Sequence, residues 1–258
     1  MRTFIVLLAV GWALCAAPAL AGDCPGKAGN GVEVTAIGPG PALVLSDARK
    51  VMLWAIIVPV LPRDDKAVAA KRAARTVELF LKKHLMGKTV HLSDLGKADR
   101  RNRTPAHVRI ASDSETGTTW LQQELVSKGL ARASGTGGGC AKALLAIEEK
   151  ARRAQRGFWA SGGFKVRRAS RPGPLYKLAN SFQIVEGTVR AVGKSRKVVY
   201  LSFGDDWRKD FTVAVRGRAI NTDGLEGKAI RVRGWLSLRN GPLIDVFDGG
   251  QIERLGAK

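Results

Sequence analysis

Acidic side chains are scarce in this sequence. Its 258 residues include 22 Asp and Glu against 43 Lys and Arg, which gives a formal net charge of +21. An excess of this size creates a field that concentrates polyanions, and nucleic acid, acidic glycans and anionic lipid all meet that description. Because 45% of the residues are hydrophobic, the share expected of a globular protein, we expect most of the chain to fold.

Long hydrophobic runs are also lacking. The apolar run at residues 4–15 follows Arg2 and is too short to span a bilayer. An A-x-A arrangement ends at Ala21. We therefore predict a secretory signal peptide at residues 1–21, an exported protein that is periplasmic or secreted, and no transmembrane segment in the mature chain.

Cysteine is nearly absent, with three in the chain. Cys15 leaves with the signal peptide, together with one Arg and no acid, so the mature protein carries +20 and two cysteines. Two cysteines in an exported protein favour one disulfide, Cys24 to Cys140, and two free thiols are the alternative. The disulfide would hold the amino-terminal arm against the helix that follows GTGGG.

The hydrophobic pattern predicts two domains. The first, residues 22–160, alternates as five strands and three helices. Its strands are expected at residues 32–37, across the meander at 43–58, at 88–92 and at 106–110, and its helices at 68–85, 119–128 and 144–158. Residues 161–181 are rich in Gly, Pro, Ser and Arg without an apolar period, which predicts a basic linker.

The second domain, residues 182–258, reads as all-β. Three strands, a short connection at 219–225 and two further strands give the element order of a small OB-type barrel. These strands are expected at residues 183–192, 197–203, 211–216, 229–238 and 243–247. Asn240-Gly241 between the last two is a two-residue hairpin signal.

Several separated segments of the first domain resemble the staphylococcal nuclease-like (thermonuclease) family in order and spacing. They are LSDARKVMLWAIIVPV, AARTVELFLKKHLMGKTVHL, DRRNRTPAHVRI, TTWLQQELVSKGLARAS and LLAIEEKARRAQRGFW, and they cover about residues 32–159. The resemblance implies a five-stranded OB-type barrel with three helices. It also implies, for active members of the family, a calcium-dependent phosphodiesterase acting on DNA and RNA.

The chain differs from that family at the positions that carry the catalytic and metal-binding side chains. The resemblance places two acids at Pro39 and Pro41, an arginine at Met52, a metal-binding Asp at Ile57 and a Glu at Val60. Pro, Ile and Val have no side-chain oxygen for calcium, and Met has no positive charge to stabilise the transition state. We therefore predict no metal site, no cofactor and a pseudoenzyme.

One catalytic position of the family survives, as Arg103 in the loop DRRNR at residues 99–103. The tyrosines that contact nucleotide in the family would fall on Gly135 and Gly137. A single arginine cannot hold calcium or activate water, so Arg103 is not expected to catalyse hydrolysis.

A relocated metal site is the alternative. It would use Asp47, Asp64 or Asp65, and the protein would then be an active secreted phosphodiesterase that requires calcium. These acids lie in a turn and a loop, where solvated carboxylates are common.

A nuclease-like protein that no longer hydrolyses nucleic acid can still bind polyanions. Arginines crowd the edge that would face phosphate, and strand alternation in the second barrel puts arginines and an aromatic ring on the face away from the core. The predicted polyanion-binding residues are Arg100, Arg101, Arg103, Arg109, Tyr200, Arg231, Arg233 and Trp235. The sequence thus predicts an exported, inactive nuclease-like binding or scaffold module, with an envelope protein-interaction module as a further alternative.

Overall fold

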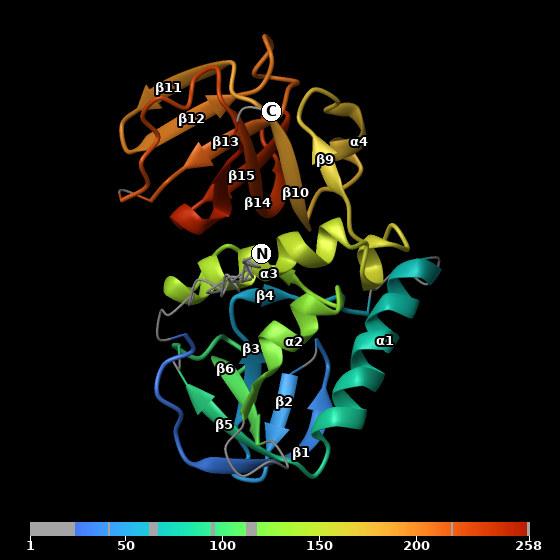
Figure 1. Cartoon of the computed structure of the whole chain (residues 1–258). Helices are drawn as coiled ribbons and strands as arrows, with labels where there is room; N and C mark the ends of the chain where they lie inside the picture. The colour runs from blue at the N-terminus through green and yellow to red at the C-terminus, as the bar shows by residue number, and fades with distance from the viewer. Residues whose placement is uncertain are drawn as a thin grey trace, which may run out of the picture.

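The protein consists of two β-barrels with a helix between them (Figure 1). The structure is a computed structural model, and it describes residues 24–40, 42–61, 67–93, 96–111, 118–217 and 219–256. The predicted signal peptide therefore lies outside the described residues, as do Pro41, Asp64 and Asp65. No helix in the described ranges is both long enough and apolar enough to cross a membrane.

The first sheet closes on itself. Its strands follow the order β3-β2-β1-β5-β6, and β3 also pairs in parallel with β6, which completes a ring of five strands in the described part of the chain. They are β1 (Gly31–Gly38), β2 (Ala42–Leu45), β3 (Lys50–Leu53), β5 (Thr89–Ser93) and β6 (Arg103–Ala111), and β7 (Thr118–Trp120) pairs with the outer edge of β6. This is the OB-type barrel that the sequence predicted.

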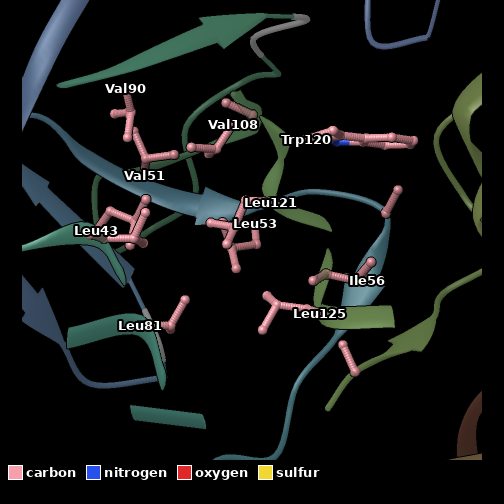
Figure 2. Packing of buried hydrophobic residues seen from close by; sticks show 14 of the residues in the cluster. Leu43, Val51, Leu53, Ile56, Leu81, Val90, Val108, Trp120, Leu121 and Leu125 are labelled. Carbon is pink, nitrogen blue, oxygen red and sulfur yellow. The ribbon is translucent and has the colours of Figure 1, made fainter. Parts of the chain in front are cut away.

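Two helices cover this barrel, α1 (Val68–Leu85) and α2 (Leu121–Ser127). α1 buries Ala74, Val77, Leu81 and Leu85, which recur at helical spacing. Figure 2 shows Leu81 and the α2 residues Leu121 and Leu125 near barrel side chains such as Leu53, and all of these are buried. Each buried leucine contributes about 1.5–3 kcal/mol, so this shared core holds barrel and helices together.

The second sheet has the same strand order. β10 pairs with β14, β14 with β15, β15 in parallel with β13, and β13 with β12, which returns to β11. Because β11 follows β10 after two residues, the two act as one bent first strand, and the ring closes as an OB-type barrel. The strands are β10 (Ser181–Thr188), β11 (Ala191–Ser195), β12 (Val198–Ser202), β13 (Thr212–Val215), β14 (Ala229–Leu238) and β15 (Pro242–Val246), with β16 (Ile252–Arg254) beside β14.

The predicted basic linker, residues 161–181, contains regular secondary structure that the sequence pattern did not indicate. β9 (Val166–Arg168) adds a parallel strand to β10, and a short helix, α4 (Gly173–Tyr176), follows it. Phe164 and Leu175 are buried, one between the domains and one in the core of the second barrel. Elements of three or four residues are too short to produce a periodic pattern, so hydrophobic periodicity does not reveal them.

The third helix, α3 (Gly139–Arg153), lies between the two barrels (Figure 1). Its Glu148 points to the second barrel, where Nη1 of Arg233 lies 2.8 Å from Oε1 of the carboxylate. Both side chains are almost completely buried, at 1% and 3% exposure. A buried ion pair of this kind fixes how the two domains meet, because neither charge can be left without its partner.

The predicted disulfide joins Cys24 to Cys140 at the start of α3, with 5.2 Å between the two Cα atoms. It therefore ties the amino-terminal arm to the helix that separates the barrels. Residues that are 116 positions apart in sequence enclose a long loop in the unfolded chain, and restricting that loop stabilises the folded state.

We expect reduction of this disulfide to lower the free energy of unfolding by about 4 kcal/mol, because the reduced chain regains loop entropy. Denaturant titration with and without reductant measures the change, and a Cys24→Ser, Cys140→Ser double variant should not respond to reductant. Alkylation of two thiols in exported protein purified without reductant would contradict the disulfide.

Glu148→Ala should lower the free energy of unfolding by about 3–5 kcal/mol, because it removes the more deeply buried of the two carboxylates that pair with Arg233, the other being that of Glu253. Chemical denaturation provides the measurement. Glu124→Ala is the matched control, since Glu124 forms an exposed pair with Lys128 and its loss should change stability by less than about 1 kcal/mol. Equal effects of the two substitutions would show that the interdomain pair does not stabilise the fold.

Candidate functional site

The structure brings some of the positions that carry the family's chemistry close together, whereas Ile57 lies at the domain boundary. Gly38 at the end of β1 pairs with Ala42 at the start of β2, and an Nη atom of Arg103 lies beside Gly40. Met52 sits in β3, between Ala42 of β2 and Pro105 of β6. Met52 and Arg103, two positions at which the resemblance places catalytic groups, thus lie on adjacent paired strands.

Arg103 is held by its own loop. Its Nε and Nη2 donate to Oδ2 of Asp99 at 2.9 and 2.7 Å. The backbone N–H groups of Arg101 and Arg103 both donate to Oδ1 at 2.9 Å. The hydrogen bonds from the Arg103 side chain, followed by those from the backbone, lower the pKa of Asp99 to about 2. Asp99 is thus ionised at neutral pH and compensates the charge of Arg103.

β4 (Ile56–Ile57) carries the position at which the resemblance places the family's second metal-binding Asp, and this position lies at the domain boundary. Ile57 packs against the hydrophobic cluster formed at the domain boundary, which includes Trp159 and, from β10, Phe182 and Ile184. β4 pairs with β8 (Arg132–Ala133), placing Ile57 opposite Arg132. An acid at residue 57 would lie against this apolar cluster, so the apolar side chain suits the interface.

Gly135, where a nucleotide-contacting tyrosine would fall, touches the second barrel directly. A Cβ added to Gly135 would lie 2.6 Å from the carbonyl oxygen of Gly250 and 2.8 Å from Cδ of Arg233. Its φ of +77° also favours glycine. No side chain fits at residue 135 while the barrels are docked.

Calcium does not fit the side chains at the nuclease face. Pro39, Met52, Ile57 and Val60 offer no carboxylate, and hard cations need several oxygen ligands. No group of three or more His, Cys, Asp or Glu among the described residues is arranged to hold a metal ion. Asp47, one candidate for a relocated site, is instead paired with Arg49 at 2.7 Å.

The predicted arginine cluster of the first domain is divided. Arg100 and Arg101 are exposed in the loop before β6. Arg109 is six residues beyond Arg103 in the same strand, which is about 20 Å for extended chain, and its guanidinium donates to the Pro25 carbonyl. The prediction that Arg109 shares an edge with the loop arginines is wrong.

The prediction that Arg231 and Arg233 line an open binding face is also wrong. Strand alternation does place them together on one face of β14, but α3 covers that face. Arg231 lies 3.5 Å from Glu149 of α3 and 3.3 Å from Glu186, and Arg233 is 1% exposed beside Glu148. Alternation identifies a face of a strand, but it cannot reveal that another domain packs on it.

Trp235 and Tyr200 remain accessible. Trp235, on the same face of β14, is 60% exposed and meets the Phe182 ring edge to face at the margin of the domain boundary. Tyr200 lies on the outer side of β12, where it lines an open pocket of about 490 Å³. Sequence patterns do not reveal this pocket, because its lining comes from β12, β13 and β15 and from the segments that connect them.

Two tandem OB-type barrels, the first with helices and a nuclease-like arrangement of turn, strand and arginine loop, define the class of protein. Residues 51–161 match the family model described as staphylococcal nuclease homologue, and this part of the chain belongs to that family. A search of curated proteins found no match to the chain.

We expect the Asp99 carboxyl to titrate near pH 2, and Arg103→Ala to move its midpoint up toward 3.8, because the arginine favours the ionised form. The ion pair is therefore complete above about pH 4 and is lost as the pH falls through about 2. Carboxyl NMR measures both midpoints. Asp47 is the internal control, since it pairs with Arg49 and should titrate identically in the two proteins. An Asp99 midpoint that Arg103→Ala leaves unchanged would contradict the pairing.

Proposed function

We propose that the protein is an exported, non-hydrolytic nucleic-acid-binding protein, whose nuclease-like domain serves as the platform for a second OB-type barrel. The observation that carries this proposal is the position of Ile57. The residue aligned with a metal-binding Asp belongs to the hydrophobic cluster that joins the two domains. One substitution thus removes a metal ligand and supplies an interdomain contact.

Loss of hydrolysis follows from the chemistry of the remaining groups. Phosphodiester cleavage needs a positioned nucleophile and cations where negative charge develops. Arg103 is the one such group retained at the aligned positions, and its guanidinium is bound to Asp99. Groups that act as a unit fail together, so an arginine alone gives no useful rate.

Retention of binding rests on family and charge. Members of a nuclease-like family carry a surface suited to nucleic acid, and this chain keeps a large positive excess. Arg100 and Arg101 in the first domain are exposed, as are Arg196 and Lys197 in the second. Because phosphate neutralisation releases counterions, such binding depends steeply on salt and little on base sequence.

Export is part of the proposal. Residues 1–21 have the order of a secretory signal peptide, and the Cys24–Cys140 disulfide suits an oxidising compartment such as the periplasm. Nucleic acid outside the cytoplasm is therefore the ligand class to which the protein would be exposed.

Purified protein should shift DNA and RNA in gels at low salt, with affinity falling steeply toward physiological salt, and should not cleave either in calcium or in EDTA. Calorimetry should detect no calcium binding at the nuclease face, because the required oxygen ligands are missing. The protein should come from a nuclease-deficient host.

Arg103→Ala separates real activity from contamination, because a contaminating nuclease would persist in that preparation. Calcium-dependent cleavage that disappears in Arg103→Ala would overturn the non-hydrolytic assignment and direct attention to Asp64 and Asp65. Failure to shift any nucleic acid at low salt would overturn the binding assignment. Pull-down after nuclease treatment would then test the interaction with an envelope protein.

A further inference from the structure

The pocket of the second barrel lies away from the domain boundary. The residues that contact the first domain come mainly from β10 and β14, whereas the pocket lies over β12, β13 and β15. Its lining includes Tyr200, Trp207, Thr212, Arg216, Arg239 and Leu243. Docking of the two domains therefore leaves this face of the barrel open.

The residues beside Tyr200 on the neighbouring strands have small side chains or none. The residues paired with it across the strands are Gly193 of β11 and Ala214 of β13. In the described structure, a Cβ added to Gly193 meets nothing within 4 Å, so there is open space beside the tyrosine. Ala214 is buried, so the side of the ring next to Gly193 is the one left accessible to another flat group.

Trp207 supplies a second aromatic surface on the loop between β12 and β13. It is 49% exposed, and the Arg208 guanidinium lies 4.5 Å from the centre of its ring. Two acids of this loop form ion pairs, Asp205 with Arg190 and Asp206 with Lys209, and the third, Asp210, accepts a hydrogen bond from the backbone N–H of Asp206. Paired carboxylates repel an anionic ligand less than free ones do, so the loop is compatible with phosphate.

The floor of the pocket contains an unsatisfied polar group. Thr212 is 6% exposed, and its hydroxyl oxygen has no hydrogen-bond partner among the described residues. A buried hydroxyl without a partner is costly, and a polar ligand in the pocket would supply one. Nearby, Arg216 and Arg239 share the single carboxylate of Asp245, which leaves one positive charge in excess.

The hairpin between β11 and β12 extends this face with positive charge. Lys194, Arg196 and Lys197 are exposed there, and within the described part of the chain none of them forms an ion pair. Lys197 is three residues from Tyr200, about 10 Å of strand. The hairpin cations thus lie at one end of β12, and the loop that carries Trp207 follows its other end.

We propose that this face binds single-stranded nucleic acid, with bases stacked on Tyr200 and Trp207 and phosphates held by the hairpin cations and by Arg239. Base stacking combined with backbone charge is how single strands are bound without sequence readout, and duplex bases are not free to stack on these rings. This proposal rests on the proposed function. It assigns the site at which nucleic acid binds and a preference for single strands over duplexes.

Anisotropy of a fluorescein-labelled dT oligonucleotide, against a duplex of equal length, tests the assignment on the full mature protein. Tyr200→Ala and Trp207→Ala should each weaken binding of the single strand by about ten-fold, because each removes one stacking surface. Tyr200→Phe should keep wild-type affinity. Arg196→Ala with Lys197→Ala should lower the salt slope by roughly one to two.

Gly193→Leu gives an independent variant that removes no contact. It places a side chain in the open space beside Tyr200 and should block stacking while leaving thermal stability unchanged. Phe247→Ala is the matched control, because it removes an exposed aromatic ring outside the pocket and should not affect binding. Heparin, which has charge but no bases, should bind equally to wild type and Tyr200→Ala.

The outcomes separate the two proposals. Wild-type binding that Tyr200→Ala, Trp207→Ala and Gly193→Leu leave unchanged would overturn the pocket while the proposed function stands. Equal losses for heparin and the oligonucleotide would overturn stacking as the mode of recognition. Absence of any nucleic-acid binding by the wild type at low salt would overturn both.

Discussion

The buried contact between Arg233 and Glu148 is the constraint on which the arrangement of the two domains depends. Oε1 of Glu148 accepts from Arg233 at 2.8 Å, and Oε2 accepts from the backbone N–H of Ala133 at 2.6 Å. Arg233 in turn donates to the Ala133 carbonyl at 2.9 Å. The helix, the strand β8 and the second barrel therefore share one closed set of hydrogen bonds. Arg233 also pairs with Glu253 of the second barrel, so its buried charge is satisfied from both domains when the barrels are docked.

That docking gives a physical reason for the apolar stretch VMLWAIIVPV. Val51 and Leu53 belong to the core of the first barrel, Ile56 joins them, and Ile57 faces the cluster between the domains. The apolar side chains are used on both sides of the strand. At residue 135, glycine lets the backbone of the second barrel approach within contact distance. Ile57 and Gly135 are therefore two positions at which the side chain present allows the second barrel to pack.

The two barrels share a strand order but use their surfaces differently. In each, the third strand pairs in parallel with the fifth, and the first strand pairs with the second and the fourth. The second barrel turns β14 toward the first domain and keeps β12, β13 and β15 outside. A rigid platform that presents a free OB-type face is well suited to ligand binding, because the strands hold the aromatic and cationic groups in place.

The sequence by itself determined the local structure. Period-two alternation identified the strands of both barrels, and helical spacing identified α1. The sequence also favoured a disulfide between Cys24 and Cys140, which the structure contains. The chain's resemblance to the nuclease family correctly indicated the first barrel. Tertiary structure decided the roles of the charged residues. Arg231 and Arg233 alternate with apolar neighbours like solvent-facing side chains, yet they are buried because α3 brings glutamates to them. Alternation is a property of one strand, whereas burial depends on which surfaces meet, and that is fixed by contacts between residues that are far apart in sequence.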